Sequence, residues 1–399
     1  MSSDQHLMQN YRRLPARFVR GEGCWLFDAD GKRYLDALCG ISVTNLGHCH
    51  AAVTEAIVEQ ARTLLHTSNL YHIAQQERLA DQLCAASGMN RAFFCNSGAE
   101  ANEAAIKLAR LHAHQRGIAS PTIICFSGSF HGRTLATIAA TASAGMREGF
   151  APDMPGFLHA EFNNVDAVRT LFAEHANHIA AVLVEPVQGE GGIHIAEPVF
   201  LHALRELCNE SGALLMLDEV QSGNARCGAY FAHQQLADGS ALTVDVVTTA
   251  KGLGNGVPIG ACLARGEAAE VMAPGKHGST FGGNPLVCAA ANAVVQTIHE
   301  QNLAKRAIDL GLQLGTVFCE QLGALAGVTH IRQRGLMIGI ELDADCSNIM
   351  AEGLQRGIVL NVTAGNVIRL LPPLVMSDAE CAQVADMVCN LVRDTLSEN

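Results

Sequence analysis

The sequence predicts an α/β protein, with a large domain built on a mostly parallel, doubly wound sheet and a smaller α+β domain. Short apolar runs that suit strands precede helix-like segments, as at residues 122–126 and 213–217. Repeated strand–helix units favour a parallel sheet with helices on both faces. The pattern changes after Gln301. The later segments are a helix over 303–322, strand-like runs over 335–342, 358–362 and 367–373, and a closing helix over 378–396.

Three parts of the chain are expected from these patterns. Residues 1–55 form an N-terminal segment that packs with the small domain, residues 56–300 form the large domain, and residues 301–399 form the small C-terminal domain. A chain of 399 residues has room for about two domains with a sizeable core.

The composition excludes several kinds of partner. Lys and Arg number 27 against 39 Asp and Glu, giving a formal net charge of -12, which argues against a nucleic-acid partner. The 14 cysteines include no C-x-x-C pair and are interpreted as reduced core residues of a cytosolic protein. The first 20 residues lack the apolar core of a secretory signal, and no apolar run reaches membrane-spanning length. We therefore expect a cytoplasmic protein without a membrane partner.

The N-terminal elements are a strand pair and a helix. Residues 24–27 and 33–36 flank a turn-type sequence and predict a hairpin. Helical spacing of apolar residues predicts a helix over 51–65. His48 and His50 form an H-x-H pair between these elements, but no third ligand lies nearby in the sequence, so no metal site is predicted.

A strand over 91–95 leads into a turn of small residues and a strong helix. The N–H groups and the dipole at such a helix start favour an anion. Ser97 adds a hydroxyl, and Gly98 would let the backbone approach a phosphate closely. The alternative is a simple helix cap, in which Asn96 or Ser97 satisfies the first turn.

The ends of two further strands carry candidate ligand contacts. Phe130 and Arg133 follow one of them, where an aromatic ring could stack on a flat ligand and an arginine could hold a carboxylate. The alternative is loop packing with a surface arginine. The strand over 180–184 runs into a glycine-rich loop with Glu185 and Glu190, which is expected near a ligand.

Asp218 and Lys251 each follow a buried strand. The aspartate needs a partner, and a protonated pyridine nitrogen would be one. A lysine at a buried strand end is costly unless the site uses it. Burial lowers the pKa of an ammonium group, and a neutral amine can attack a carbonyl to form a Schiff base. The alternative is a loop lysine with its charge in water. Together the two residues suit an aldehyde cofactor bound to lysine.

These candidate residues share one place in the predicted fold. They follow strands, and ligands of a doubly wound parallel sheet bind at the carboxyl ends of its strands. A loop rich in glycine, serine and threonine over 277–285 precedes one more helix-like segment, over 286–299.

On these segments the chain resembles the class III (ω-amino acid) aminotransferases, and it is most similar to acetylornithine aminotransferases. The family uses pyridoxal 5′-phosphate (PLP) and has fold type I. The resemblance runs from Leu26 to Pro373. Its blocks, in the family's order, are NSGAEANEAAIKLAR, SFHGRTLAT, EPVQGEGG, LDEVQSG, TTAKGLGNGVPIGA and GSTFGGNP.

The resemblance implies a set of cofactor-binding residues. Lys251 resembles the lysine that carries the cofactor and moves the proton, and Asp218 resembles the partner of the pyridinium nitrogen. Thr280 matches a threonine that reaches the phosphate in the neighbouring subunit, which implies a homodimer. The other matches are Ser97, Gly98 and Ala99 with the phosphate-binding turn, Phe130 with the aromatic against the ring, and Gln221 with the residue near its 3-hydroxyl.

The resemblance also implies substrate-binding residues. Arg133 and Ser279 match substrate positions, and Arg369 is similar to the arginine that meets the α-carboxylate of glutamate. Glu190 is similar to the glutamate that pairs with this arginine when an ω-amine is bound, since an unpaired buried arginine would be costly. The alternative is that Glu190 and Arg369 form an unrelated structural ion pair, or never meet.

The sequence departs from the family pattern in a few places. Residues 223–228 read GNARCG where the family has G-x-G-R-T-G, Ala51 replaces a usual proline, and residues 332–335 lack the first glycine of R-G-x-G. His131 is typical of acetylornithine enzymes, because ornithine δ-aminotransferases usually carry tryptophan there. None of these departures touches the cofactor set.

The resemblance implies transfer of the ω-amino group of N-acetyl-L-ornithine to 2-oxoglutarate, giving N-acetyl-L-glutamate 5-semialdehyde and L-glutamate. Succinylornithine, ornithine and 4-aminobutyrate remain alternative donors, and acetyl and succinyl donors share the same core motifs. A PLP mutase or decarboxylase would also keep Lys251 and Asp218. A non-catalytic binding module would have no reason to retain Lys251.

Overall fold

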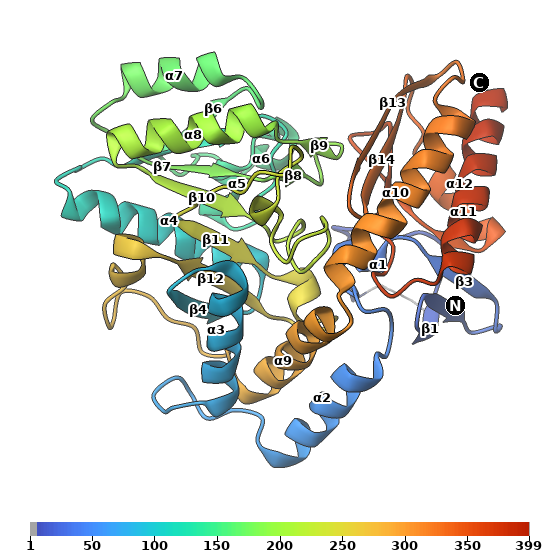
Figure 1. The fold of residues 1–399 in the computed structure, drawn as a ribbon, viewed down its shortest axis with the longest axis horizontal. Helices are drawn as coiled ribbons and strands as arrows, with labels where there is room; N and C mark the ends of the chain where they lie inside the picture. The colour runs from blue at the N-terminus through green and yellow to red at the C-terminus, as the bar shows by residue number, and fades with distance from the viewer. Residues whose placement is uncertain (1–5, 399) are drawn as a thin grey trace.

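The computed structural model describes residues 6–398 and is organised around one seven-stranded sheet (Figure 1). The strand order is β4-β12-β11-β10-β7-β5-β6, and β12 is antiparallel to both of its neighbours, whereas the other pairs are parallel. The predicted mostly parallel sheet is therefore confirmed, although β12 was not predicted. The strands are β4 (Arg91–Cys95), β5 (Thr122–Phe126), β6 (Phe157–Ala160), β7 (Ile179–Val184), β10 (Leu214–Asp218), β11 (Val246–Thr249) and β12 (Gly260–Ala264).

Helices cover both faces of this sheet because successive side chains of a strand point to opposite sides. On β10, Leu214 and Met216 belong to the apolar cluster formed with α4 (Gly98–Gln115). Leu215 and Leu217 belong to the cluster on the other face, which includes residues of α8 (Pro198–Ser211). The alternation assigns Asp218, the next even-numbered residue of β10, to the α4 face.

Shorter elements and three more long helices complete this lobe. Helix α2 packs on α9, and α9 also packs on α3. The helices are α1 (Cys39–Ser42), α2 (Ala51–Thr63), α3 (Ala74–Ser87), α5 (Leu135–Ala140), α6 (Ala144–Arg147), α7 (Val165–Glu174) and α9 (Pro285–Glu300). The remaining short elements are β8 (Val187–Gln188), β9 (His194–Ile195), η1 (Ala232–Gln234), η2 (Lys251–Leu253) and η3 (Gly266–Glu270).

The C-terminal lobe is an antiparallel sheet in the order β13-β14-β17-β16, packed against helices (Figure 1). Buried apolar residues of α10, α12, β14 and β17 form one cluster. The predicted helices over 303–322 and 378–396 are confirmed. The elements are α10 (Leu303–Leu322), β13 (Val328–Arg334), β14 (Met337–Leu342), α11 (Ile349–Arg356), β16 (Asn361–Thr363), β17 (Val367–Leu370) and α12 (Asp378–Glu398).

The N-terminal strands join this second lobe. Strands β1 (Phe18–Glu22), β2 (Trp25–Asp28) and β3 (Arg33–Asp36) are antiparallel, so the predicted hairpin is confirmed. Strand β3 then pairs in parallel with β15 (Ile358–Val359). Chain segments far apart in sequence are therefore held in one sheet.

Arg226 connects both lobes from a fully buried position. Its guanidinium donates to the Ser42 hydroxyl at 3.1 Å and to the backbone oxygens of Leu336 and Pro372. The preceding residue, Ala225, has φ of +68°, a left-handed conformation that costs a residue with a Cβ about 1–2 kcal/mol. This conformation explains why a glycine suits the family pattern at that position.

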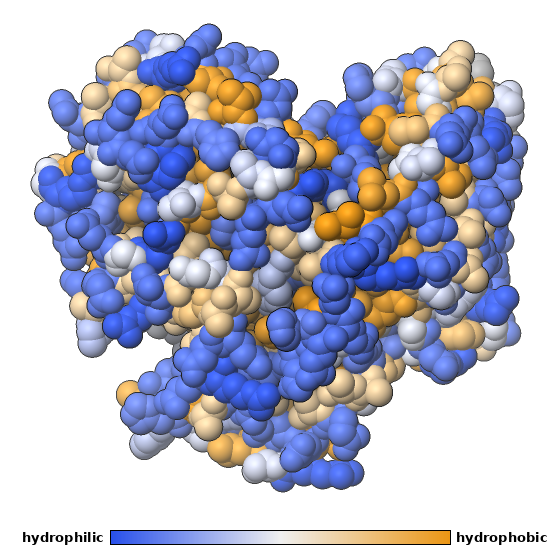
Figure 2. All heavy atoms as spheres, in the orientation of Figure 1, coloured by the Kyte–Doolittle hydropathy of each residue, from blue (hydrophilic) through white to orange (hydrophobic). Residues whose placement is uncertain are grey.

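Hydrophilic residues dominate the face of the molecule in Figure 2, and hydrophobic residues gather mainly near the junction of the lobes. Over the described residues, none of the helices combines the length and apolarity that a membrane crossing requires.

Candidate active site

The carboxyl ends of β10 and β11 open on a cavity of about 460 Å³. Most of the residues predicted for a site line this one cavity, although they come from loops far apart in sequence. The predicted residues on its wall are Ser97, Gly98, Ala99, Phe130, Arg133, Glu190, Asp218, Gln221 and Lys251.

Lys251 lies two residues beyond the end of β11 and begins the short helix η2. Its backbone has φ of +49°, a left-handed conformation that is unusual for a residue with a side chain. Burial lowers the pKa of its ammonium group, the negative charge of Glu190 opposes that shift, and the positive charge of Arg369 adds to it. A lowered pKa increases the share of neutral amine, the form that reacts with a carbonyl.

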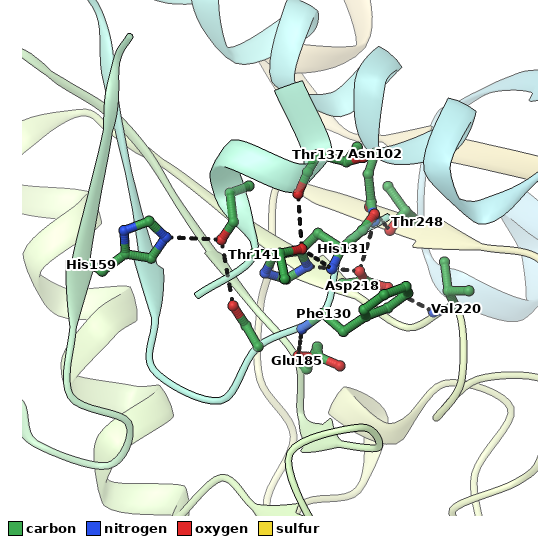
Figure 3. A network of polar contacts seen from close by, with 12 residues as sticks. Asn102, Phe130, His131, Thr137, Thr141, His159, Glu185, Asp218, Val220 and Thr248 are labelled. Carbon is green, nitrogen blue, oxygen red and sulfur yellow. Dashed lines mark hydrogen bonds and ion pairs between the residues drawn. The ribbon is translucent and has the colours of Figure 1, made fainter. Parts of the chain in front are cut away.

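Asp218 is held by three hydrogen-bond partners at the end of β10 (Figure 3). Its Oδ2 accepts from Asn102 Nδ2 at 2.7 Å and lies 2.8 Å from His131 Nδ1. Its Oδ1 accepts the N–H of Val220 at 3.0 Å. A carboxylate has about four acceptor positions, so the three donors leave one for a ligand.

Residues Asn102 and His131 were given no role in the sequence analysis, although both line the cavity. A usable signal existed for Asn102, because it is an amide on a helix face otherwise made of buried alanines and isoleucine. Helical spacing alone does not show that this face meets the end of β10. His131 follows a strand, as Phe130 does, but only the fold shows that its ring turns to Asp218.

The helix start at residues 97–99 has the geometry of a capped helix. Ser97 is the N-cap of α4, and its Oγ accepts the Glu100 N–H at 3.2 Å, as the simpler alternative proposed. A Cβ at Gly98 would lie 2.6 Å from Val220 Cγ1, so packing against Val220 requires glycine there whether or not a phosphate binds. The first N–H groups of α4, including that of Ala99, lie at a helix end where the helix itself supplies no acceptor.

Ser279 and Thr280 were also predicted as site residues, but neither lines the cavity. Ser279 Oγ accepts the Gly282 N–H at 2.9 Å and lies 3.2 Å from Nδ2 of Asn96, which lines the cavity. Thr280 is exposed and is absent from the cavity wall of this single chain.

Arg369 and Glu190 meet in an ion pair of 2.6 Å. The alternative in which they never meet is therefore wrong. Arg369 is fully buried on β17, its Nε donates to Asn361 Oδ1 at 3.1 Å, and its Nη2 has no partner among the described residues. Burial alone would raise the pKa of Glu190, but the charge and hydrogen bond of Arg369 outweigh it and lower the pKa. The Nη2 group thus keeps its N–H donors for a further anion.

Phe130 and Arg133 lie together beside the cavity. The guanidinium carbon of Arg133 is 5.7 Å from the centre of the Phe130 ring, and the Arg133 side chain is exposed. The Phe130 N–H donates to Glu185 Oε2 at 3.1 Å. Burial, followed by the charge of Asp218, raises the pKa of Glu185 well above its usual range. The raised pKa favours the protonated form of Glu185, which lies on the cavity wall as the sequence led us to expect of this loop.

The residues present fit a pyridine aldehyde that carries a phosphate. Lys251 provides an amine, Asp218 one open acceptor position and the start of α4 an anion site. Gln221 Oε1 is buried without a partner among the described residues, so it can accept a ligand hydroxyl. Such a donor set is that of a PLP enzyme.

The comparisons with known proteins identify the family. The model for "Aminotransferase class-III" matches residues 7–392. The "Acetylornithine aminotransferase" of Nitrosomonas europaea is 51% identical over 387 residues, covering 97% of both chains. A crystal structure of the ornithine aminotransferase from Toxoplasma gondii has a TM-score of 0.94 at 32% identity, covering 99% of this chain and 94% of that one.

One further solved structure, the N-acetylornithine aminotransferase of Stenotrophomonas maltophilia, has a TM-score of 0.84 at 33% identity and covers 99% of each chain. The fold and the matches together define a PLP-dependent transferase of fold type I. The chain belongs to the class III aminotransferases and is a PLP-dependent aminotransferase.

Proposed function

We propose that this enzyme transfers the ω-amino group of N-acetyl-L-ornithine to 2-oxoglutarate, giving N-acetyl-L-glutamate 5-semialdehyde and L-glutamate. The observation that carries this proposal is the ion pair of Glu190 and Arg369 beside Lys251, because one cavity must accept two unlike substrates. The relatives at 48–51% identity that carry the name acetylornithine aminotransferase support the same donor.

Bound PLP supplies an aldehyde that takes up the amino group and a protonated ring that stabilises negative charge. Lys251 would hold the aldehyde, Asp218 the ring nitrogen and the start of α4 the phosphate. Phe130 and Gln221 would contact the ring and its hydroxyl, with Ser97, Gly98 and Ala99 forming the phosphate turn.

Lys251 would also carry the proton that each half-reaction moves. Its burial lowers the pKa of the amine, which increases the share of neutral side chain that can accept a proton from the reacting substrate carbon and return it. The reacting carbon is Cδ of acetylornithine in one half and Cα of glutamate in the other. In both halves this lysine is the first residue of the short helix η2.

Glu190 and Arg369 would distinguish the two halves. The reacting end of acetylornithine has no carboxylate, so Arg369 stays neutralised by Glu190. When 2-oxoglutarate binds, its α-carboxylate would take Arg369, whose Nη2 is unpartnered in the described chain. Glu190 is partly exposed, so it can turn toward water. Arg133 would hold the distant carboxylate in both halves, with Ser279 nearby.

The test of this switch is the Arg369→Ala variant. We expect it to slow the half-reaction with 2-oxoglutarate on the order of tenfold to a hundredfold more than the half with acetylornithine, as loss of a charged contact of about 1.5–3 kcal/mol implies. Glu190→Ala should do the reverse and favour α-amino donors such as glutamate. Single-turnover absorbance of the bound cofactor measures each half separately.

Arg306→Ala is the control, since it removes an ion pair with Asp378 and a hydrogen bond to the Met376 backbone oxygen in the C-terminal lobe, and Arg306 does not line the cavity. It should affect both halves equally and little. Equal slowing of both halves in Arg369→Ala would show that the pair is structural.

We also propose that the enzyme works as a homodimer in which Thr280 reaches the phosphate in the partner's cavity. The exposure of Thr280, outside the wall of its own cavity, supports this proposal. Exposed apolar residues near it support an interface, namely Leu64, Leu65, Leu70, Tyr71 and Phe281.

Mixing two inactive chains tests the shared site. Lys251→Ala lacks the lysine, and Thr280→Glu brings a bulky acid toward the phosphate. A heterodimer of the two contains one cavity with both residues intact, so random exchange should restore roughly a quarter of wild-type activity. Each variant alone is the control. No recovery in a mixture shown to contain heterodimers, or a fully active monomer by sedimentation, would contradict the proposal.

The prediction of a cytoplasmic protein stands as part of this proposal. All 14 cysteines are free, and most are buried, as in proteins of reducing compartments. The division into residues 1–55, 56–300 and 301–399 likewise stands as a proposal, which the pairing of β3 with β15 supports.

A further inference from the structure

A chain of buried polar side chains leads to Asp218 (Figure 3). The Thr248 hydroxyl donates to Asn102 Oδ1 at 2.7 Å, and Asn102 Nδ2 donates to Asp218 Oδ2 at 2.7 Å. Thr248 is 0% and Asn102 1% exposed. Burying a threonine hydroxyl and an amide is costly unless each is paired, so their presence here calls for a function.

The sheet itself brings these residues together. Thr248 lies opposite Asp218 in the parallel register of β10 and β11. Thr248 lies two residues after Val246 on β11, so both side chains point to the face that packs with α4. Asp218 points to the same face. Asn102 enters this face from the second turn of α4. The neighbouring Thr249 lies two residues after Val247 on the same strand, so its side chain points to the opposite face of the sheet, where Val247 packs.

Only one orientation of the Asn102 amide satisfies all of its neighbours. Asp218 Oδ2 and the backbone oxygen of His131, 2.8 Å away, accept hydrogen bonds only, so the amide nitrogen must face them. The amide oxygen then faces Thr248, whose hydroxyl is the donor it needs. Without the Thr248 hydroxyl, the Asn102 amide oxygen would be buried and unpaired, and no hydrogen bond to that oxygen would hold the amide in this orientation.

His131 adds a second fixed donor. Its Nδ1 lies 2.8 Å from Asp218 Oδ2, and its Nε2 is buried without a partner among the described residues. Nδ1 faces an acceptor and Nε2 faces none within the described chain, so the geometry favours a ring that donates from Nδ1 to Asp218. Asn102, His131 and the Val220 N–H thus surround the Asp218 carboxylate with hydrogen-bond partners.

We propose that Thr248 and Asn102 are positioning residues that, with His131, hold Asp218 as an oriented acceptor for a protonated ring nitrogen in the cavity. The pair acts through Asp218 and touches no substrate. This inference rests on the proposed role of Asp218, and Asp218→Asn serves as the reference that separates the two.

The test compares Thr248→Val, which keeps the shape and loses the hydroxyl, with Thr249→Val as the matched control. Thr249 is equally buried on the same strand, and its hydroxyl accepts from Asn224 at 3.0 Å, so the control loses a similar bond on the other face. Three quantities are measured on purified protein: the ¹⁵N chemical shift of ring-labelled cofactor, the dissociation constant of the cofactor, and thermal unfolding. Asn102→Leu is a second variant of the same contact.

We expect Thr248→Val to raise the cofactor dissociation constant about fivefold to tenfold, as loss of one buried hydrogen bond implies. It should also shift the ¹⁵N signal part of the way toward that of the unprotonated ring, and Asp218→Asn should shift it fully. Thr248→Ser restores the hydroxyl and should restore both values. Thr249→Val should lower thermal stability similarly, without changing the dissociation constant or the ¹⁵N signal.

The positioning role is wrong under one combination of results. In that case Asp218→Asn changes both the dissociation constant and the ¹⁵N signal, whereas Thr248→Val and Asn102→Leu leave both unchanged, as Thr249→Val does. If Asp218→Asn itself changes neither, the proposed role of Asp218 fails.

Discussion

Lys251→Ala is expected to reduce turnover roughly 10⁴-fold or more, because it removes both the amine that holds the cofactor and the group that moves the proton. The buried position of Lys251 and the lowered pKa of its amine support both roles. Treatment with borohydride, followed by digestion and mass spectrometry, should find the cofactor fixed to the peptide with residue 251 in the parent. The Lys251→Ala variant should retain no covalently bound cofactor after denaturation.

Lys305→Ala is a suitable control, since Lys305 is exposed on α10 and, within the described part of the chain, forms an ion pair with Asp309 alone. It should trap cofactor as the parent does. Covalent trapping at a single site in Lys251→Ala would show that another lysine holds the cofactor.

Asp218→Asn is expected to slow the chemical step at least about 100-fold, while cofactor binding weakens much less. A charge-assisted hydrogen bond contributes about 1.5–3 kcal/mol in general, and here it also sets the charge of the ring. Asparagine keeps the shape but offers one acceptor oxygen, whereas the carboxylate accepts from Asn102, His131 and Val220. Some loss of stability should therefore accompany the loss of rate.

Asp245→Asn is the control that separates the loss of stability from the loss of rate. Asp245 lies just before the other end of β11, accepts the Leu215 N–H at 2.7 Å and pairs with Arg205. Its replacement should lower the melting temperature without changing the absorbance of the bound cofactor. Near-normal turnover in Asp218→Asn would contradict the assignment.

Much of the site could be predicted from the sequence because it is built at strand ends. The runs that became β4, β5, β10 and β11 are apolar and end in a polar or glycine-rich loop. A parallel sheet brings such loops to one edge. Asp218 and Lys251 were therefore predictable from their own segments and the resemblance.

The contacts between segments could not be predicted in this way. The pairing of Asn102 with Thr248 depends on the register of β10 against β11 and on which face of α4 meets the sheet. The strand β12 runs antiparallel and was missed, because its short stretch of small residues lacks β-branched side chains. The glycine at residue 98 was predicted for a phosphate, whereas the fold adds a contact with Val220 that requires it.

The most direct test of the proposed reaction is glutamate formation from 2-oxoglutarate by the purified enzyme with each of four amine donors. The donors are N-acetyl-L-ornithine, N-succinyl-L-ornithine, L-ornithine and 4-aminobutyrate. We expect the highest kcat/KM with N-acetyl-L-ornithine and a stoichiometric yield of glutamate and the semialdehyde. A higher kcat/KM with any other donor, or consumption of the amine without glutamate, would contradict the proposed reaction.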